Sequence, residues 1–169
     1  MRLLFEIDTK NYSDTDEVII RPSSRSIIIK KQKILMVYSK KYNYYKFPGG
    51  GIEEGETSIE AVIRETYEEA GLIIKKENLK EFGVVKRTEK INNKVFYQDN
   101  YYYLVNKYDK GQSQQLDDYE YEEGYTLVLV DPVTAIKTNI NSNHGSANQI
   151  MLIREAKVLE ILIKEGYFK

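Results

Sequence analysis

The segment that decides the fold runs from Gly50 to Leu72 and reads GGIEEGETSIEAVIRETYEEAGL. It ends in three acidic residues, Glu65, Glu68 and Glu69, that a helix would not gather by itself. Residues three and four apart occupy neighbouring positions on one helical face. Like charges at that spacing destabilise a helix by roughly 0.2–0.5 kcal/mol per pair, and acids near its C-terminus oppose the helix dipole. We therefore expect compensation from outside the helix, for which a divalent cation is the natural candidate.

A solvated acidic surface is the alternative interpretation of this cluster. Glu60, Arg64 and Glu68 follow one another at intervals of four, which is ordinary surface stabilisation of a helix. That ladder does not include Glu65 or Glu69, and neither has a basic residue at the favourable spacing on the same helix. Taken alone, the cluster fits a solvated face and a metal site equally well.

The flanking residues predict where the helix begins and ends. Thr57 followed by Glu60 matches a capping box, so the helix should start near Ser58. Gly71 is placed to end it. Apolar spacing predicts a buried stripe and leaves the glutamates off it, available to a ligand. The predicted stripe consists of Ile59, Val62, Ile63, Thr66 and Ala70.

The whole segment resembles the Nudix box, and we call residues 50–72 the box segment. Its fixed positions are Gly50, then after five residues Glu56, then after seven residues the run Arg64-Glu65-Thr66-Tyr67-Glu68-Glu69-Ala70-Gly71-Leu72. Every fixed position is filled, although Thr66 stands where a larger aliphatic residue is more common. A match at this many fixed positions is far more specific than a single glycine motif.

The resemblance implies an α/β fold: a Nudix-type α/β/α sandwich with a mixed sheet, a loop-helix-loop at the box and a C-terminal helix. It also implies hydrolysis of a nucleoside diphosphate linked to another group. Glu65, Glu68 and Glu69 would be the metal ligands, with Mg²⁺ or Mn²⁺ as the cofactor. Hard cations of this kind take oxygen ligands, and a chain with no cysteine and one histidine disfavours zinc.

Other box positions would have a structural role in such a protein. Glu56 and Arg64 would hold the loop and helix in register, by pairing with each other or with a ligand carboxylate. Gly50 and Gly71 would shape the two loops. Upstream of the helix, Phe47 and Pro48 lead into the glycines 49–51, which we expect to form a loop with little side-chain bulk. The backbone of such a loop can approach a ligand closely.

Length and composition fit one ordinary domain spanning residues 1–169. The formal net charge of −1 gives no basic excess for binding nucleic acid, so a nucleotide-type small molecule is the expected partner. Neither a signal-peptide core nor an apolar run of membrane-spanning length is present, and the default expectation is a cytoplasmic protein without membrane contact. Oligomeric state stays open, and a homodimer is compatible with the sequence.

Strand-like runs lie before and after the box segment, and no repeat or linker divides the chain. Residues 26–30 and 33–38 predict a hairpin, as do residues 79–89 and 95–107 around the turn at Asn92 and Asn93. Shorter strands are expected at 44–47 and 125–130, with a strand or extension in residues 1–22. A short helix should open at Asp131-Pro132 and run through Lys137.

The C-terminal helix is predicted over residues 145–166. Ser146 with Gln149 reads as a second capping box, and Gly166 is positioned to end the helix. Its expected apolar face comprises Ile150, Met151, Val158, Ile161 and Leu162.

A second acidic stretch, LDDYEYEEGY, covers residues 116–125. A solvated acidic loop explains any single member. The Nudix resemblance implies one further glutamate before the last strand, as a metal ligand or as the base that activates water, with Glu120 preferred and Glu123 second, while Glu122 stays open. The catalytic set is therefore Glu68, Glu69 and Glu120, and the sequence does not decide which of them takes the proton.

Several other residues can be explained by a structural role or by a functional one. Lys46, Arg21 and Arg25 could meet substrate phosphates, but basic residues near strands are generally solvated. His144 is better explained as a loop residue than as an acid or base. Tyrosines at alternating strand positions pack across a sheet more simply than they stack on a nucleobase; these are Tyr42, Tyr44, Tyr97, Tyr101 and Tyr103.

Two other functions compete with the hydrolysis of a nucleotide pyrophosphate linkage. A non-catalytic nucleotide-binding sensor on the same fold usually has a damaged box, whereas this one keeps its glutamates. An RNA-end pyrophosphohydrolase is weakened by the balanced charge. Nucleoside triphosphates and nucleoside diphosphate derivatives both remain open as substrates.

Overall fold

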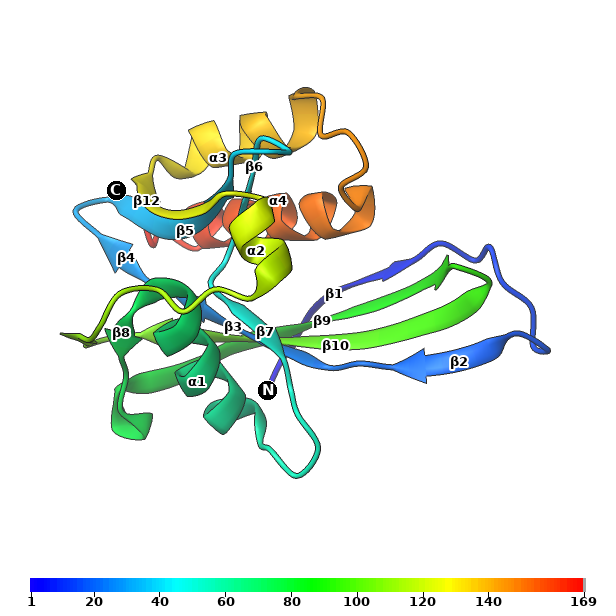
Figure 1. The fold of residues 1–169 in the computed structure, drawn as a ribbon, viewed down its shortest axis with the longest axis horizontal. Coiled ribbons are helices and arrows are strands. Elements are labelled where there is room, and N and C mark those ends of the chain that lie inside the picture. The colour runs from blue at the N-terminus through cyan, green and yellow to red at the C-terminus, as the bar shows by residue number, and fades with distance from the viewer. Residues whose placement is uncertain (169) are drawn as a thin grey trace.

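The computed structural model describes residues 1–168, which fold into three layers with helices on both sides of β-structure (Figure 1). Helix α1 (Ser58–Ala70) lies on one side. Helices α3 (Pro132–Asn141) and α4 (Gln149–Lys164) pack together on the other side. This arrangement confirms the predicted α/β/α sandwich.

The strands of the central layer form a mixed six-stranded sheet, a four-stranded antiparallel sheet and a separate pair. In the larger sheet, β10 runs antiparallel to β9 but parallel to β2 and β3, which follow one another along its other edge. Pro22 separates β2 from β3, since it has no N–H for the ladder. The larger sheet contains β1 (Leu3–Asp8), β9 (Leu79–Ile91), β10 (Lys94–Val105), β2 (Glu17–Ile20), β3 (Ser23–Ile27) and β7 (Gly49–Gly51). The four-stranded sheet contains β12 (Tyr125–Val130), β5 (Lys33–Ser39), β4 (Ile29–Lys30) and β6 (Tyr44–Lys46), and the pair is β8 (Leu72–Ile73) with β11 (Asp109–Lys110).

Both predicted hairpins are present and have two-residue turns with positive φ at each position. Asn92 and Asn93 have φ of 49° and 63° between β9 and β10, and Lys31 and Gln32 have φ of 50° and 62° between β4 and β5. Such turns match the right-handed twist of the strands they join. The local polar signals therefore located the turns correctly.

One predicted strand, residues 26–30, is in fact divided between the two sheets. Strand β3 ends at Ile27 and β4 begins at Ile29, while Ile28 is completely buried between them. Its carbonyl oxygen accepts from the backbone N–H of Leu35 at 2.9 Å. A run of apolar residues buried on both faces cannot reveal from sequence that its hydrogen bonds go to different sheets.

Helix boundaries follow the predictions only where the cap itself was identified correctly. Helix α3 begins after Asp131, whose side chain accepts from Thr134 N at 2.9 Å, but it extends beyond Lys137 to Asn141. Ser146 is not the cap of α4. Asn148 takes that place and its Oδ1 accepts from Met151 N at 2.9 Å, so the helix starts at Gln149.

The main core lies between the larger sheet and helices α3 and α4. Of the apolar face predicted for α4, Val158 and Leu162 are fully buried, whereas Ile150, Met151 and Ile161 are partly exposed. The buried cluster consists of Ile27, Ile34, Met36, Phe47, Phe82, Val85, Tyr102, Leu104, Ala135, Val158, Leu159 and Leu162.

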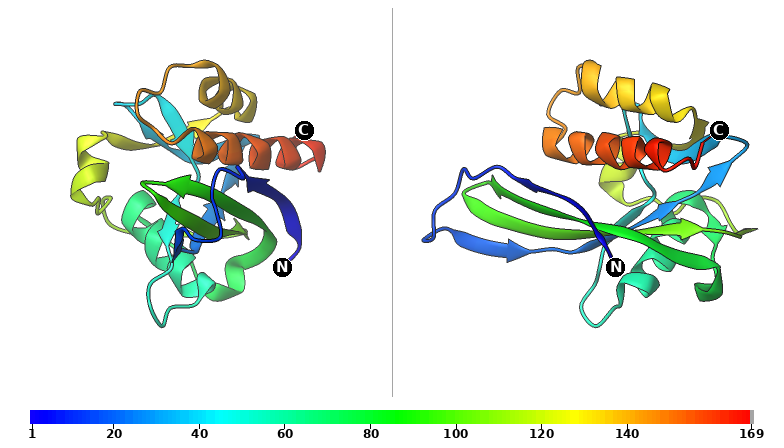
Figure 2. Two further views of the ribbon diagram at one scale, coloured as in Figure 1. Left: turned by 90° about the vertical axis from the view of Figure 1, so that its right-hand side faces the viewer. Right: turned by 180° about the vertical axis from the view of Figure 1, so that it is seen from behind.

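Strands β1 and β2 and the turn end of the β9–β10 hairpin reach well past the helices, as the front view (Figure 1) and the rear view (Figure 2, right) show. No helix within residues 1–168 combines the length and apolar character needed to cross a bilayer.

Candidate active site

The box helix begins and ends where the sequence predicts. Thr57 Oγ1 accepts from Glu60 N at 3.2 Å, while Glu60 Oε2 accepts from Thr57 N at 2.8 Å, which completes the capping box. Gly71 closes the helix with φ of 63°, and its N–H donates to Tyr67 O at 2.8 Å. Local signals therefore fix the length and direction of the helix that bears the acidic cluster.

The buried face of α1 differs from the predicted stripe. Ile59 and Ile63 are only partly buried, whereas Glu69 is 1% exposed. The prediction that all three clustered glutamates point off the buried face is therefore wrong for Glu69. The buried positions are Ala61, Val62, Thr66, Glu69 and Ala70.

Glu69 is buried because the β6–β7 region supplies both of its partners. Lys46 Nζ lies 2.5 Å from Glu69 Oε1, and the backbone N–H of Gly49 donates to Oε2 at 2.8 Å. Lys46 is itself only 5% exposed. The counter-charge that the helix lacks thus comes from a lysine distant in sequence. An inward-facing lysine within a predicted strand was the available signal, because a buried lysine needs an acidic partner.

Arg64 joins three of the other box glutamates. Its Nε and Nη2 donate to the two carboxylate oxygens of Glu56 at 2.8 and 2.9 Å, so the expected pairing of these residues is present. Its Nη1 donates to Glu65 at 2.8 Å and to Glu68 at 3.2 Å, and Nη2 also reaches Gly51 O at 3.0 Å. The hydrogen bonds from Arg64 hold the pKa of Glu56 below its ordinary value.

The glycines 49–51 form strand β7, not the expected loop. They pair antiparallel with Ser23–Arg25 of β3. A Cβ on Gly49 would lie 2.1 Å from Ser24 O, and a Cβ on Gly50 would lie 2.4 Å from Glu65 Oε2. Glycine is needed here because the neighbouring strand and the Glu65 carboxylate approach the backbone closely.

The second acidic stretch contains a short helix, α2 (Asp118–Glu122), where a loop was expected. Glu120 is buried, with its carboxylate accepting from Asp117 N and Tyr119 OH, each at 3.0 Å. Glu123 turns the other way and accepts from Tyr44 OH at 2.8 Å, and Glu122 is exposed. Of the three candidates in this stretch, only Glu120 lines the cavity beside the box glutamates.

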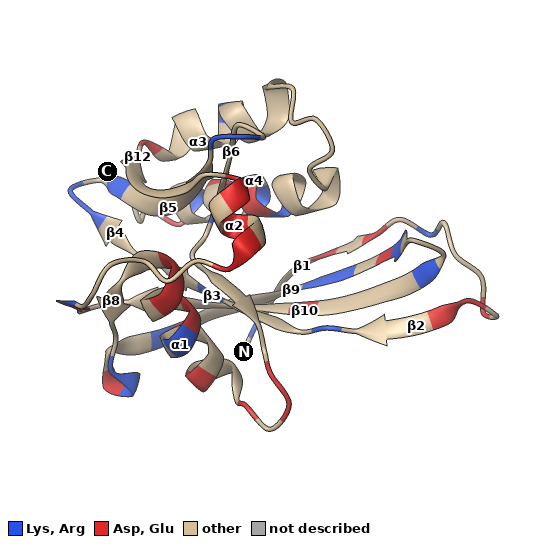
Figure 3. Cartoon of the chain, in the orientation of Figure 1, with Lys and Arg blue, Asp and Glu red and all other residues tan. Residues whose placement is uncertain are grey.

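That cavity, of about 460 Å³, gathers residues from β7, α1 and α2. Acidic residues are prominent on both helices (Figure 3). Burial raises the pKa of Glu65. Burial and the charge of Glu69 together raise the pKa of Glu120 to about 7. The residues that line this cavity include Arg21, Gly50, Arg64, Glu65, Glu68, Glu69 and Glu120.

This donor set suits a hard divalent cation, since it offers oxygen ligands and carries more negative charge than Arg64 and Lys46 balance. Within residues 1–168 no three acidic, histidine or cysteine side chains converge closely enough to hold a metal ion. The box carboxylates are instead directed to Arg64 and Lys46. A cation would therefore have to draw them away from these basic partners.

Comparison with known proteins agrees with the geometry. The profile of the NUDIX domain matches residues 19–147. The chain belongs to the NUDIX family. Similar solved structures include a MutT protein from Bacillus halodurans, with 16% identity over 79% of this chain and 80% of that chain at a TM-score of 0.56. A MutT NUDIX hydrolase from Burkholderia pseudomallei has 19% identity over 80% of this chain and 97% of that chain, with a TM-score of 0.55. At these identities the structures establish the fold.

Curated relatives match a shorter part of this NUDIX protein. RNA pyrophosphohydrolase from Actinobacillus succinogenes is 46% identical over 48 residues, which cover 27% of this chain and 24% of the relative. The protein of the same name from Mannheimia succiniciproducens is 44% identical over 48 residues, with the same coverage. The match thus spans about a quarter of the length of these relatives.

The remaining candidate residues of this NUDIX protein have structural roles or line the cavity wall. Arg25 is buried and its Nη1 donates to Gly49 O at 2.6 Å. His144 is also buried, with ring nitrogens 3.0 Å from the carbonyl oxygens of Tyr42 and Asn139, so it lies outside the box cavity. Arg21 is exposed and lines the box cavity.

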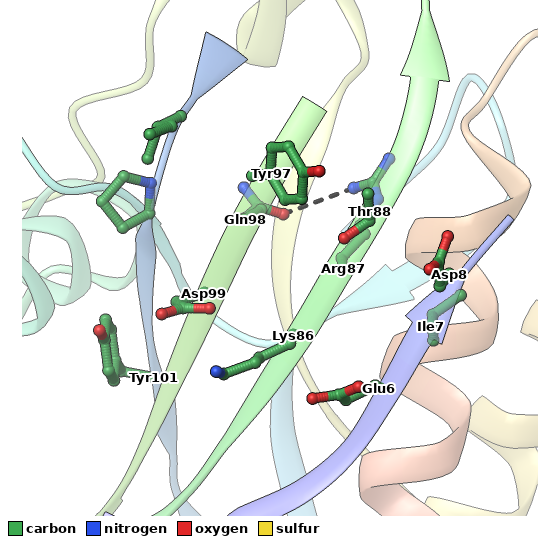
Figure 4. Close-up of a pocket in the computed structure, with 12 residues that line it drawn as sticks. Glu6, Ile7, Asp8, Lys86, Arg87, Thr88, Tyr97, Gln98, Asp99 and Tyr101 are labelled. Carbon is green, nitrogen blue, oxygen red and sulfur yellow. Dashed lines mark hydrogen bonds between the residues drawn. The ribbon is translucent and has the colours of Figure 1, made fainter. Parts of the chain in front are cut away.

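A larger cavity, of about 580 Å³, lies on the projecting part of the sheet away from the box segment. Tyr97, Asp99 and Tyr101 of β10 reach this cavity from one face of the strand, and Lys86 of β9 is paired opposite Asp99 (Figure 4). Two of the tyrosines considered for base stacking, Tyr97 and Tyr101, therefore line this cavity, and no box glutamate is among its lining residues.

Proposed function

We propose that the protein is a metal-dependent hydrolase that cleaves a phosphoric anhydride linkage in a nucleotide-type small molecule. The observation that carries this proposal is the complete box segment, folded so that Glu65, Glu68 and Glu69 share one cavity with Glu120 from α2. Nucleoside triphosphates and nucleoside diphosphate derivatives are the substrate classes that the sequence leaves open.

Glu65, Glu68 and Glu69 would hold Mg²⁺ or Mn²⁺. When bound, the metal would neutralise phosphate charge and lower the pKa of the attacking water. The protein's own contribution is to keep these carboxylates in place: Arg64 bridges Glu65 and Glu68, and Gly50 leaves the space that the Glu65 carboxylate fills.

Glu120 is the residue we propose to accept the proton from water. It reaches the cavity from α2, whereas the other glutamates come from α1. Glu68 forms an ion pair with Arg64 and Glu69 with Lys46, but within residues 1–168 Glu120 forms an ion pair with neither base. Tyr119 OH and Asp117 N fix its two oxygens. Its carboxylate is thus oriented by neutral donors, which leaves its basicity available for proton transfer.

The test is a screen of nucleoside triphosphates, nucleotide sugars and other nucleoside diphosphate derivatives, with Mg²⁺, with Mn²⁺ and with chelator. Products identified by mass spectrometry in ¹⁸O-labelled water would show which phosphorus is attacked. We expect turnover of at least one class with metal and none with chelator. Metal-stimulated binding of a nucleotide without turnover would instead favour the sensor.

Glu68→Gln is the cleanest variant for assigning catalysis to the box. The Glu68 side chain is 38% exposed and pairs with Arg64, which keeps its bonds to Glu56 and Glu65, so the fold should survive. We expect kcat to fall at least about 100-fold, on the scale of losing one catalytic group. Glu69→Gln should abolish activity too, but it leaves Lys46 buried without its partner and should also lower stability.

Glu77→Gln, in the exposed turn after α1, is the control and should keep wild-type turnover. Full activity of folded Glu68→Gln would contradict the assignment.

A second candidate is removal of pyrophosphate from an RNA end, favoured by the 46% identity to an RNA pyrophosphohydrolase over 48 residues. The balanced charge of the chain argues against tight RNA binding. Including a 5′-triphosphorylated RNA oligonucleotide in the screen separates the two. A kcat/KM for RNA that exceeds that for nucleotides and falls steeply with salt would favour the RNA-end activity.

A further inference from the structure

Lys46 and Glu69 form a buried ion pair directly beside the box cavity. The Nζ–Oε1 distance is 2.5 Å, with the two residues 5% and 1% exposed. Lys46 Nζ also lies 4.8 Å from the centre of the Tyr125 ring, so the ammonium is held between a carboxylate and an aromatic face. The lysine therefore has a fixed place in the interior and is not a solvated surface charge.

The pair lies between two cavities. Glu69 lines the box cavity, and Lys46 lines a neighbouring cavity of about 370 Å³ together with Arg25 and Tyr125. Tyr119 borders both. The ammonium is thus in contact with a carboxylate of the box cavity, although Lys46 itself lines the neighbouring one.

Both oxygens of Glu69 already have a donor. Lys46 occupies Oε1 and the N–H of Gly49 occupies Oε2. A divalent cation that approaches this carboxylate meets the positive charge of Lys46 a few ångströms away, and Lys46 and Glu69 are both buried. Coulomb repulsion between cations is strong at such distances and weakly screened when the groups are buried.

We propose that Lys46 is an internal counter-ion that competes with the divalent metal for Glu69 and thereby weakens metal binding. In the absence of metal, Lys46 neutralises a carboxylate that would otherwise be buried and unpaired. When metal binds, the cation must either displace the ammonium from Oε1 or share the carboxylate with it. The inference rests on the proposed function only in taking Glu69 as a metal ligand.

The test is the affinity of the full chain for Mn²⁺ alone, without substrate, measured by calorimetry and by electron paramagnetic resonance of free Mn²⁺. Lys46→Gln removes the charge but keeps a donor for Glu69, and Lys46→Met removes both. We expect each to bind Mn²⁺ about tenfold more tightly than wild type, because the repulsion is gone. Lys46→Arg keeps the charge and should bind within about threefold of wild type.

Lys41→Met is the matched control for net charge. Lys41 is exposed and its ammonium lies 5.2 Å from the Tyr42 ring centre. Its loss should change Mn²⁺ affinity less than about twofold, since exposed charges are screened by salt. A thermal-unfolding series gives an independent measurement: saturating Mn²⁺ should raise the Tm of Lys46→Gln more than that of wild type, because ligand stabilisation follows affinity.

Equal or weaker Mn²⁺ binding by folded Lys46→Gln would overturn the inference, as would the absence of Mn²⁺ binding in wild type and variants alike. If Lys46→Met does not fold, Lys46→Gln decides. The predicted order of affinities without hydrolysis of any substrate would support the inference and refute the proposed function. Metal-dependent hydrolysis together with an unchanged affinity of Lys46→Gln for Mn²⁺ would support the proposed function and refute the inference.

Discussion

Thr66 shows at the scale of one residue how the box segment tolerates a departure from its usual pattern. The Nudix box more often has a larger aliphatic residue there. Thr66 is fully buried, as expected for a helix position on the core side, but its Oγ1 has no hydrogen-bond partner within residues 1–168. A buried hydroxyl without a partner is unfavourable, so this position gives up stability.

Replacing the hydroxyl by a methyl group should therefore stabilise the protein. We expect Thr66→Val to raise the free energy of unfolding by roughly 1 kcal/mol, measured by urea denaturation. Thr66→Ser keeps the hydroxyl and removes the methyl, so it should lower stability by about 1 kcal/mol. A Thr66→Val variant less stable than wild type would show that the hydroxyl is in fact satisfied.

The C-terminal end of α1 is held by a loop that lies about 40 residues later in the sequence. The left-handed conformation of Gly71 was predictable from its place after the helix. What was not predictable is that residues 111–115 wrap this end: Gly111 N donates to Gly71 O at 2.8 Å, and Gln115 N donates to Glu68 O at 2.7 Å. The same loop closes over the backbone of the acidic cluster.

Gly71→Ala should accordingly lower the unfolding free energy by more than the positive φ of this position alone would explain. A Cβ there would lie 2.2 Å from Gln112 O, so strain in φ is joined by a steric clash with backbone. We expect a loss of about 2 kcal/mol or more in unfolding free energy by urea denaturation. Gly55 is the matched control, because its φ of 78° is similarly positive but the space around its Cβ is open. Gly55→Ala should lose only about 1 kcal/mol, and equal losses in the two variants would exclude the clash.

At the scale of the whole molecule, one buried carboxylate ties the C-terminal helix to the larger sheet and to the link between β6 and β7. Glu155 of α4 accepts from Phe47 N at 2.6 Å, from Tyr102 OH at 3.0 Å and from Arg154 at 2.8 and 3.0 Å. Burial acts to raise the pKa of Glu155, but the charges of Arg154 and Arg25 outweigh it, and the pKa lies below its ordinary value. Glu155 is thus charged in the folded protein at neutral pH.

A lowered folded-state pKa makes this contribution to stability dependent on pH. It should be complete above about pH 4.5, the ordinary pKa of a glutamate, and should be lost as the pH falls toward the folded-state value. Glu155→Gln should lower unfolding free energy by about 3 kcal/mol at pH 7, since Arg154 is left buried without its partner. Urea denaturation at pH 7 and pH 4 should show the difference from wild type shrinking in acid. Glu160→Gln, exposed on the same helix, is the control and should change stability by less than about 0.5 kcal/mol. A difference that stays constant from pH 7 to pH 4 would contradict the role of the Glu155 charge.

The sequence by itself determined the features that depend on near neighbours in the chain. The capping box at Thr57, the glycine that ends α1, the turns at Asn92–Asn93 and Lys31–Gln32, and the spacing of the box glutamates are all local in this sense. The Nudix resemblance turned that spacing into a fold, which the structure confirms.

Tertiary structure alone decided which charge meets Glu69 and which acidic residue of 116–125 reaches the box cavity. Glu69 is neutralised by Lys46, and the choice of Glu120 over Glu123 follows from the direction in which each side chain leaves α2 and its end. Likewise, the strand formed by the glycines 49–51 exists only because β3 lies beside it. Helical spacing reports neighbours on one element, whereas burial and ion pairing depend on distances through space. The acidic cluster therefore looked unpaired in the sequence although its counter-ion lies 2.5 Å away in the fold.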